Sequence, residues 1–186
     1  MSVQNISVNK RSEATNTMAT AAILIALGTV LRLITPSMGI KPDFMCVTMF
    51  VAITLSPTFR HTLTLGVVCG VIASLTTHFP AGQIPNIIDK IASAFFVMIL
   101  FKFLYHKYPK VSLLTYGLIY FLGTLVSGLI FVYTAFLIGR LMGISANIAL
   151  FSKGTLPMIS AVVVPTAVAN AFFGSLLTKV MLMIRK

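Results

Sequence analysis

The sequence predicts an all-α integral membrane protein, a bundle of six transmembrane helices with both termini on the cytoplasmic side (N-in/C-in). Three observations predict this class. Of the 186 residues, 58% are apolar and 9% are charged, and the mean hydropathy of +1.00 is too high for a soluble domain of this size. From Met18 onward, apolar runs approach the roughly 17–25 residues that a spanning helix needs. Lys and Arg punctuate these runs singly or in pairs, as membrane-flanking charges do.

The chain divides into a short polar tail and one membrane domain. Residues 1–17 are polar and contain no apolar segment, so we expect a disordered cytoplasmic tail without a cleavable signal peptide. Residues 18–186 are expected to form one six-span domain. The predicted spans are, in order, 18–34, 44–55, 62–77, 85–105, 111–138 and 155–184.

Proline marks several of the span boundaries. The first span ends at Thr35-Pro36, and the fourth begins near Pro85. The second span is short and lies between Pro42 and Pro57, and we expect it to extend into both flanks. The fifth is long enough to tilt. Pro165 predicts a kink within the last span, which neighbouring helices can accommodate.

The distribution of basic residues predicts the orientation. With the N-terminus inside, nine Lys and Arg residues lie on the cytoplasmic side and five outside, which favours the N-in, C-in arrangement. The inner nine are Lys10, Arg11, Arg60, Lys102, Lys107, Lys110, Lys179, Arg185 and Lys186, and the outer five are Arg32, Lys41, Lys90, Arg140 and Lys153. This orientation places three loops, residues 41–43, 79–90 and 139–154, together on the outer face.

Enzyme, metal and nucleic-acid functions find little support. The chain has no nucleotide-binding GxxxxGK[ST] loop, no HExxH, no GxSxG and no cluster of carboxylates. His61, His78 and His106 fall in three separate loops. We therefore expect no catalytic residue, no metal and no cofactor, and a membrane enzyme is the weakest hypothesis. The net charge of +11 is scattered rather than gathered on one face, so nucleic acid is not expected either.

The outer loops carry the groups that a zwitterionic ligand needs. Such a ligand requires a carboxylate for its ammonium, a cation or helix N-terminus for its carboxylate, and a wall for its side chain. Asp43 and Asp89 are the two acidic residues beside apolar spans, where charges survive mainly for function. Asn86, Asp89 and Lys90 would share one helix face. The candidate substrate-binding residues are Lys41, Asp43, Phe79, Gln83, Asn86, Asp89 and Lys90.

Structural explanations remain open for each group. Asn86 with Asp89 also fits a helix cap with an acid in the first turn, and the lysines can be interface residues whose stems lie along apolar surface. Asn170 fits an interhelical hydrogen bond as well as a ligand contact. Cys46 and Cys69 fit small buried hydrophobes. The candidate wall aromatics, which sequence cannot rank against simple packing, are Phe44, Phe50, Phe79, Phe95, Phe96 and Tyr120.

Two of these loop segments carry a family resemblance. The turn Lys41-Pro42-Asp43 with the Met-rich stretch after it, together with residues 79–90, resembles the tryptophan-transporter family of substrate-binding S components of energy-coupling factor (ECF) transporters. The resemblance implies a protein of the bacterial cytoplasmic membrane that captures tryptophan from outside. It also implies partners, namely a transmembrane T component and two cytoplasmic ATPases.

The first span carries a pattern that fits such a partner. The resemblance implies small residues on this span that let a helix of the T component approach, and Ala22 and Ala26 have the small-xxx-small spacing. Packing within the protein explains the pattern equally well. The leading hypothesis is a substrate-capture subunit of an ATP-driven importer. The alternative is a self-sufficient small secondary carrier or channel for an amino acid or vitamin-like solute. That alternative predicts a titratable residue deep in a span or an internal repeat.

Overall fold

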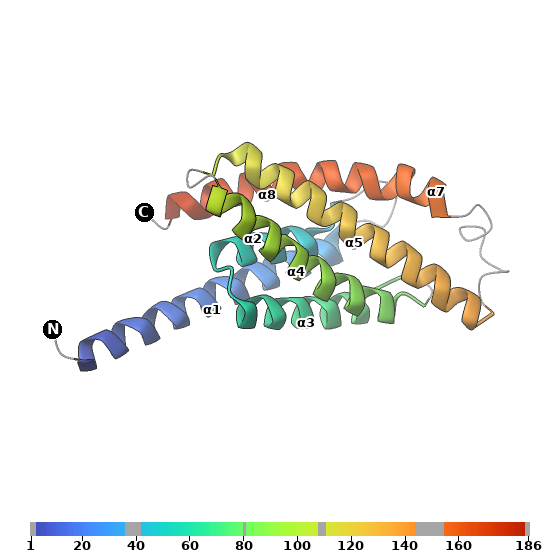
Figure 1. Ribbon diagram of the computed structural model, residues 1–186. Helices are drawn as coiled ribbons and strands as arrows, with labels where there is room; N and C mark the ends of the chain where they lie inside the picture. The colour runs from blue at the N-terminus through green and yellow to red at the C-terminus, as the bar shows by residue number, and fades with distance from the viewer. Residues whose placement is uncertain (1–2, 36–41, 80, 108–110, 144–154, 185–186) are drawn as a thin grey trace.

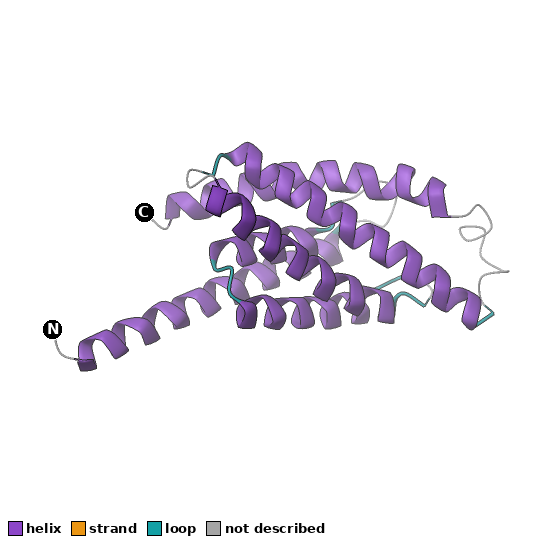
Figure 2. Cartoon of the chain, viewed as in Figure 1, coloured by secondary structure: helices purple, strands orange, loops and turns teal. Residues whose placement is uncertain are grey.

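The computed structural model describes residues 3–35, 42–79, 81–107, 111–143 and 155–184, and these form an all-helical bundle (Figure 2). No strand occurs within these ranges. The helices are α1 (Val3–Ile34), α2 (Phe44–Leu55), α3 (Phe59–Leu75), α4 (Gln83–Lys107), α5 (Leu113–Leu141), α7 (Thr155–Met158), the π-helical turn η1 (Ile159–Val163) and α8 (Val164–Ile184). The last three follow one another without a break, so they form one continuous helical segment.

The helices run alternately up and down the bundle. Figure 1 shows both chain termini at one end and the end of α5 with the start of α7 at the other. Helices that follow one another in sequence pack side by side, as α1 with α2, α3 with α4, and α4 with α5, while α8 packs on α5 and α2. As a result, α1, α3 and α5 end where α2, α4 and α7 begin. The described residues of the three loops predicted to share a face, 42–43, 79, 81–90 and 139–143, therefore lie at one end of the bundle.

Helix α2 forms the centre of the core. All its residues from Met45 to Thr54 are buried, and it contacts α1, α3, α4, α5 and α8. A helix that is apolar on every side is expected to be surrounded by protein in this way. The predicted bounds of α2 are confirmed, but its expected extension into the flanks is wrong. Asp43 caps its N-terminus by accepting a hydrogen bond from the Cys46 N–H, and it ends at Ser56 before Pro57.

The span predictions are confirmed in part. Among the described residues, three helical segments are long and apolar enough to cross a membrane: Glu13–Ile34 of α1, Leu113–Leu141, and Thr155–Ile184. Helices α2 and α3 are apolar but shorter, and α4 carries Asp89 and Lys90 in its interior. The six-span count and its orientation stay predictions.

The N-terminal helix is longer than its predicted span. It begins at Val3, within the segment for which the composition predicted a disordered tail. Residues 3–17 contain no glycine or proline that would interrupt a helix. Residues 13–16 are exposed, so the burial that holds the later turns of α1 does not extend to them.

Helix α4 lies unusually close to α3. A Cβ atom added at Gly70 would lie 3.0 Å from the Cα of Ile87, and one added at Gly66 would lie 3.1 Å from the Cα of Ile91. Gly66 and Gly70 thus form a small-xxx-small contact that lets the two backbones approach. This contact fixes the helix that carries Asn86, Asp89 and Lys90.

The helical segment in which Pro165 predicts a kink contains an irregular turn. Pro165 has no N–H for a hydrogen bond to the preceding turn. The π-helical turn η1 lies immediately before it, and the Val164 N–H donates to the Ile159 carbonyl. Five-residue turns of this kind often occur near functional sites.

Candidate substrate-binding site

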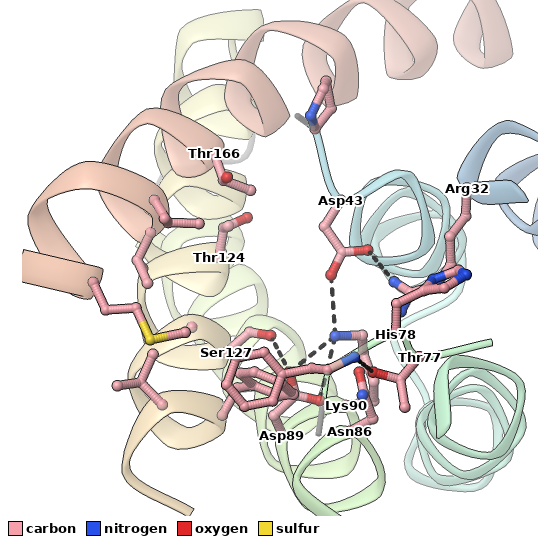
Figure 3. A pocket seen from close by; sticks show the side chains of 18 of the residues that line it. Arg32, Asp43, Thr77, His78, Asn86, Asp89, Lys90, Thr124, Ser127 and Thr166 are labelled. Atoms are coloured by element: carbon pink, nitrogen blue, oxygen red, sulfur yellow. Dashed lines mark hydrogen bonds and ion pairs between the residues drawn. The ribbon is translucent and has the colours of Figure 1, made fainter. Parts of the chain in front are cut away.

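A cavity of about 410 Å³ lies at the end of the bundle where α1 and α3 end and α2, α4 and α7 begin (Figure 3). Its volume falls within the range of small-molecule sites, roughly 300–1,000 Å³. One set of lining residues is polar or charged: Arg32, Thr35, Asp43, Thr77, His78, Asn86, Asp89, Lys90, Thr124, Ser127 and Thr166. The other is apolar: Pro42, Phe79, Gly128, Phe131, Val132, Met158, Val162 and Val163. The cavity is therefore suited to a ligand with a polar head and an apolar body.

Lys90 joins the two carboxylates of the site. Its Nζ lies 3.1 Å from Oδ2 of Asp43 and 2.9 Å from Oδ2 of Asp89, with Oδ1 of Asp89 at 3.3 Å (Figure 3). Lys90 and Asp89 are almost fully buried. Because buried charges are costly unless they are paired and hydrogen-bonded, Lys90 stabilises the ionised form of both carboxylates, and the two carboxylates stabilise the charge of Lys90.

Polar side chains of α5 and α8 complete this network. The Ser127 hydroxyl donates to Oδ2 of Asp89 at 2.8 Å. On the other side, the backbone N–H of Asp43 donates to Oδ1 of Asn170, whose Nδ2 donates to Thr124. Residues from α2, α4, α5 and α8 are thus tied together around the cavity. The hydrogen bonds from Lys90 and Ser127 use most of the hydrogen-bonding capacity of the buried carboxylate Asp89.

Arg32 lies at the last turn of α1, beside Asp43. Its Nη1 is 3.5 Å from Oδ1 of Asp43, and its Nε donates to Oγ1 of Thr76 at 3.0 Å. Asp43 itself lies in the loop before α2. Burial raises the pKa of its carboxyl, but the positive charges of Lys90 and Arg32 outweigh burial and hold this pKa below its usual range. Asp43 is therefore an anion between two cations.

A tight turn places Phe79 against the apolar side of the cavity. The Phe79 N–H donates a hydrogen bond to Oγ1 of Thr77, and the Gly82 N–H donates one to the Phe79 carbonyl at 2.9 Å. Ala81 has φ of 56°, a left-handed conformation that is uncommon outside glycine and Asn. The Phe79 ring meets Phe131 of α5 edge to face, with centroids 5.2 Å apart and an interplanar angle of 74°. This aromatic pair lies next to the charged network.

The structure brings five of the seven predicted binding residues to the cavity: Asp43, Phe79, Asn86, Asp89 and Lys90. Gln83, at the start of α4, is exposed and is not among the lining residues. Lys41 lies outside the described residues. Asn86 lies inside α4 and donates to the Gly82 carbonyl at 2.7 Å, so its side chain does not act as the N-cap.

Most other candidates serve packing. Phe50 stacks on Tyr120 in the core, Phe44 meets Phe173, and Phe95 meets Phe59. Asn170 makes interhelical hydrogen bonds with Asp43 and Thr124, which is the structural role that the sequence left open beside a ligand contact. Both cysteines are buried and form no disulfide, and the Sγ of Cys46 lies 3.5 Å from the Ser127 hydroxyl. Ala22 and Ala26 are exposed on α1, so within the described residues they do not serve close packing between helices of this chain.

Several lining residues carried no signal in the sequence. Arg32 supports the predicted orientation but belongs to no predicted binding motif, although it lies near the end of a span that Thr35-Pro36 closes. Ser127 and Phe131 belong to a long apolar run in which no spacing marks one residue as facing a cavity. Met158 and Val163 were likewise unmarked. The charged half of the site was therefore easier to find than the apolar half.

Comparison with known proteins identifies the family. A model of the tryptophan transporter TrpP family matches residues 14–185. A probable tryptophan transport protein of Bacillus subtilis is 40% identical over 158 residues, covering 84% of each chain. One of Clostridium perfringens is 32% identical over 168 residues, covering 86% of this chain and 87% of the relative. A third, of Clostridium acetobutylicum, is 33% identical over 160 residues, covering 84% of this chain and 85% of the relative.

No solved structure matches the chain. Because the family model covers nearly the whole sequence and the relatives align over most of their length, the chain belongs to the tryptophan transporter TrpP family of multi-pass membrane proteins, which are transporters rather than enzymes.

Proposed function

We propose that this protein binds L-tryptophan in the cavity and acts as the substrate-capture subunit of an ATP-driven ECF importer. The observation that carries the proposal is the division of the cavity into a charged side and an aromatic side. Asp43, Asp89 and Lys90 border one side, and Phe79 and Phe131 border the other. An amino acid with a large aromatic side chain has the same division.

The charges at the site favour a zwitterion. Asp43 and Asp89 carry two negative charges, and Lys90 and Arg32 carry two positive ones, so this group of four is balanced before a ligand arrives. A zwitterionic ligand adds no net charge, whereas an anion or a cation would leave an uncompensated charge in a mostly buried site. The ligand ammonium would share a carboxylate with Lys90. The indole would pack on Phe79 and Phe131, and Asn86 would contribute an amide.

The direction of transport rests on topology. In the N-in arrangement the cavity opens outward, because it lies at the bundle end away from both termini. The sequence has no nucleotide-binding loop, so a partner must supply the energy of ATP. The exposed Ala22 and Ala26 on α1 would receive a helix of the T component, to which two cytoplasmic ATPases attach.

One observation favours the second candidate, a self-sufficient carrier. Asp89 and Lys90 are a buried titratable pair within a helix, a feature that ion- and proton-coupled carriers use. The pair lies in the first turns of α4 rather than at its middle, and it also serves to hold the site together. The substrate-capture subunit is therefore the better supported function.

Two measurements test the proposal. The purified protein alone should be stabilised by L-tryptophan more than by phenylalanine or riboflavin in a thermal-shift assay. A ligand at about 100 times its dissociation constant adds roughly 2.7 kcal/mol to the folded state. Uptake in cells should require ATP, a T component and its ATPases. Stabilisation by riboflavin alone would refute the tryptophan assignment, and uptake without any partner would instead establish the self-sufficient carrier.

A further inference from the structure

The two cations of the site differ in how fully their donors are engaged. Lys90 is 1% exposed, and its ammonium already contacts both oxygens of Asp89 and one of Asp43. An ammonium has three donors, so these contacts occupy it. Arg32 has five N–H groups. Among the described residues, its hydrogen bond and ion pair involve Nε and Nη1 alone.

The contact between Arg32 and Asp43 is also loose. The distance of 3.5 Å between Nη1 and Oδ1 exceeds the roughly 2.7–2.9 Å of a strong charge-assisted hydrogen bond. The Arg32 side chain is 18% exposed and lines the cavity. Its Nε is held by Thr76, which fixes the plane of the guanidinium at the cavity wall. Arg32 thus keeps donors and position available for an anionic group in the cavity.

From these contacts we infer that Arg32 binds the carboxylate of the ligand, while Lys90 is the internal counter-ion that holds Asp43 and Asp89 together. This assignment rests on the proposed function, that an amino acid occupies the cavity. The guanidinium fork matches a carboxylate with two parallel hydrogen bonds, which an ammonium cannot offer. With the carboxylate on Arg32, the ligand ammonium lies toward Asp43 and its side chain toward Phe79.

The reverse assignment is costly. For Lys90 to bind the ligand carboxylate, it would have to give up part of its pairing with two carboxylates in a site where it is almost fully buried. Removing one partner from a buried ionic group leaves an uncompensated charge, which is strongly unfavourable. Arg32 would exchange only a long contact with Asp43 for a short one with the ligand. The ligand's own ammonium would then compensate Asp43.

Ligands that lack one group test the assignment. The dissociation constants of L-tryptophan, tryptamine, which lacks the carboxylate, and indole-3-propionate, which lacks the ammonium, are measured for the wild type and for Arg32→Gln. We expect Arg32→Gln to weaken binding of tryptophan and indole-3-propionate by about 10- to 100-fold, the range for hydrogen bonds to a charged group. Tryptamine, which has no carboxylate for Arg32 to hold, should change by less than about threefold.

Matched variants separate binding from folding and from general charge. Arg32→Lys keeps the charge but not the fork, so it should fold and lose tryptophan affinity by an intermediate factor. Arg140→Gln removes an exposed cation from the same end of the bundle and should leave all three dissociation constants unchanged.

An equal loss for tryptophan and tryptamine in Arg32→Gln would show that Arg32 acts only through Asp43, and unchanged affinities would show that it does not touch the ligand. Either result overturns the inference while tryptophan binding by the wild type stands. If the wild type binds none of the three compounds, the proposed function fails and the inference fails with it.

Discussion

The backbone N–H of Asp43 donates a hydrogen bond to Oδ1 of Asn170 at 2.9 Å, although the two residues are 127 positions apart. Asp43 caps α2, and Asn170 is fully buried in α8, where it also bonds to Thr124 of α5. A single amide therefore sets where the loop before α2 lies relative to the last helix. Since Asp43 and Thr124 line the cavity and Asn170 does not, Asn170 acts on the site by positioning these two residues.

The first prediction concerns this positioning. Asn170→Leu keeps the branched shape of the side chain but cannot accept the Asp43 N–H or donate to Thr124, so it should lower the free energy of unfolding by about 0.5–2 kcal/mol. It should also weaken tryptophan binding. Thr178→Val is the matched control, because it removes a buried hydrogen bond to Tyr120 at the other end of α8. The control should lose stability but keep tryptophan affinity, as measured by calorimetric titration. Equal affinity in the two variants would contradict a positioning role for Asn170.

The second prediction separates charge from capping at Asp43. Asp43→Asn keeps an oxygen that can accept the Cys46 N–H, so α2 should remain capped and the protein should fold. Loss of the negative charge should weaken tryptophan binding by tens of fold, since a charge-assisted contact to the ligand ammonium is lost. Asp89→Asn tests in the same way whether the more deeply buried carboxylate binds the ligand ammonium. Wild-type dissociation constants in both variants would exclude either carboxylate as the ammonium partner.

The third prediction concerns the contact between α3 and α4. Gly70→Leu would force a side chain against the backbone at Ile87 and should destabilise the protein by about 1–3 kcal/mol. Because α4 carries Asp89 and Lys90, tryptophan affinity should fall as well. Val71→Leu adds volume at a side chain that is 43% exposed on the same helix and should change neither quantity. Thermal unfolding in detergent gives the comparison, and identical midpoints for the two variants would refute the close contact.

The fourth prediction tests the topology. Gln83 and Lys107 lie at opposite ends of α4, and both are exposed. Cysteine introduced at Gln83 should react with an impermeant thiol reagent from outside intact cells, and cysteine at Lys107 should not. Cys46 and Cys69 are buried, so the wild type should give little background. The same reagent in permeabilised cells serves as the control for Lys107. Equal labelling of both positions in intact cells would overturn the N-in, six-span arrangement.

The fifth prediction tests the partner surface. Ala22→Trp or Ala26→Trp should abolish ATP-dependent uptake and co-purification with the T component, because a bulky side chain prevents close helix approach. Tryptophan binding by the isolated protein should persist, since neither residue lines the cavity. Leu27→Trp, at a position that is 41% exposed and about 140° from Ala22 and 100° from Ala26 around the helix, is the matched control and should retain uptake. Loss of folding in the Ala variants would mean that this face packs within the protein.

Much of the charged half of the site was predictable because charge is rare in an apolar chain. Asp43, Asp89 and Lys90 stood out by composition, and helical spacing placed the last two beside Asn86. The close approach of α2, α4 and α8 was not predictable, because no local pattern reports that Asp43 meets Asn170. Gln83 and Asn86 both carry a side-chain amide and lie three residues apart at the start of α4. Gln83 is exposed and Asn86 is buried at the cavity, and the sequence does not show where along this turn burial begins.

The apolar half illustrates the opposite difficulty. Phe131 and Val163 belong to runs in which nearly every residue is apolar, so periodicity does not distinguish a cavity wall from a lipid-facing surface. Helix boundaries were predicted well where proline, or a polar side chain that can cap, interrupts such runs, as at Asp43. The start of α1 was not predictable from apolar patterning, because its residues before Met18 are mostly polar.

The π-helical turn at Ile159–Val163 makes the last helix sensitive to length rather than to side-chain identity. A turn of this type accommodates one residue more than an α-helical turn does. Deleting a single residue there would let the segment relax to a regular α-helix, and the helix on either side would keep its orientation because the wider turn absorbs the extra residue. Met158 and Thr166, which flank the turn, would stay at the cavity, whereas Val162 and Val163 inside it would shift. The shape of this part of the apolar wall thus depends on the number of residues in the turn, so a deletion at a position that does not line the cavity would still alter ligand selectivity.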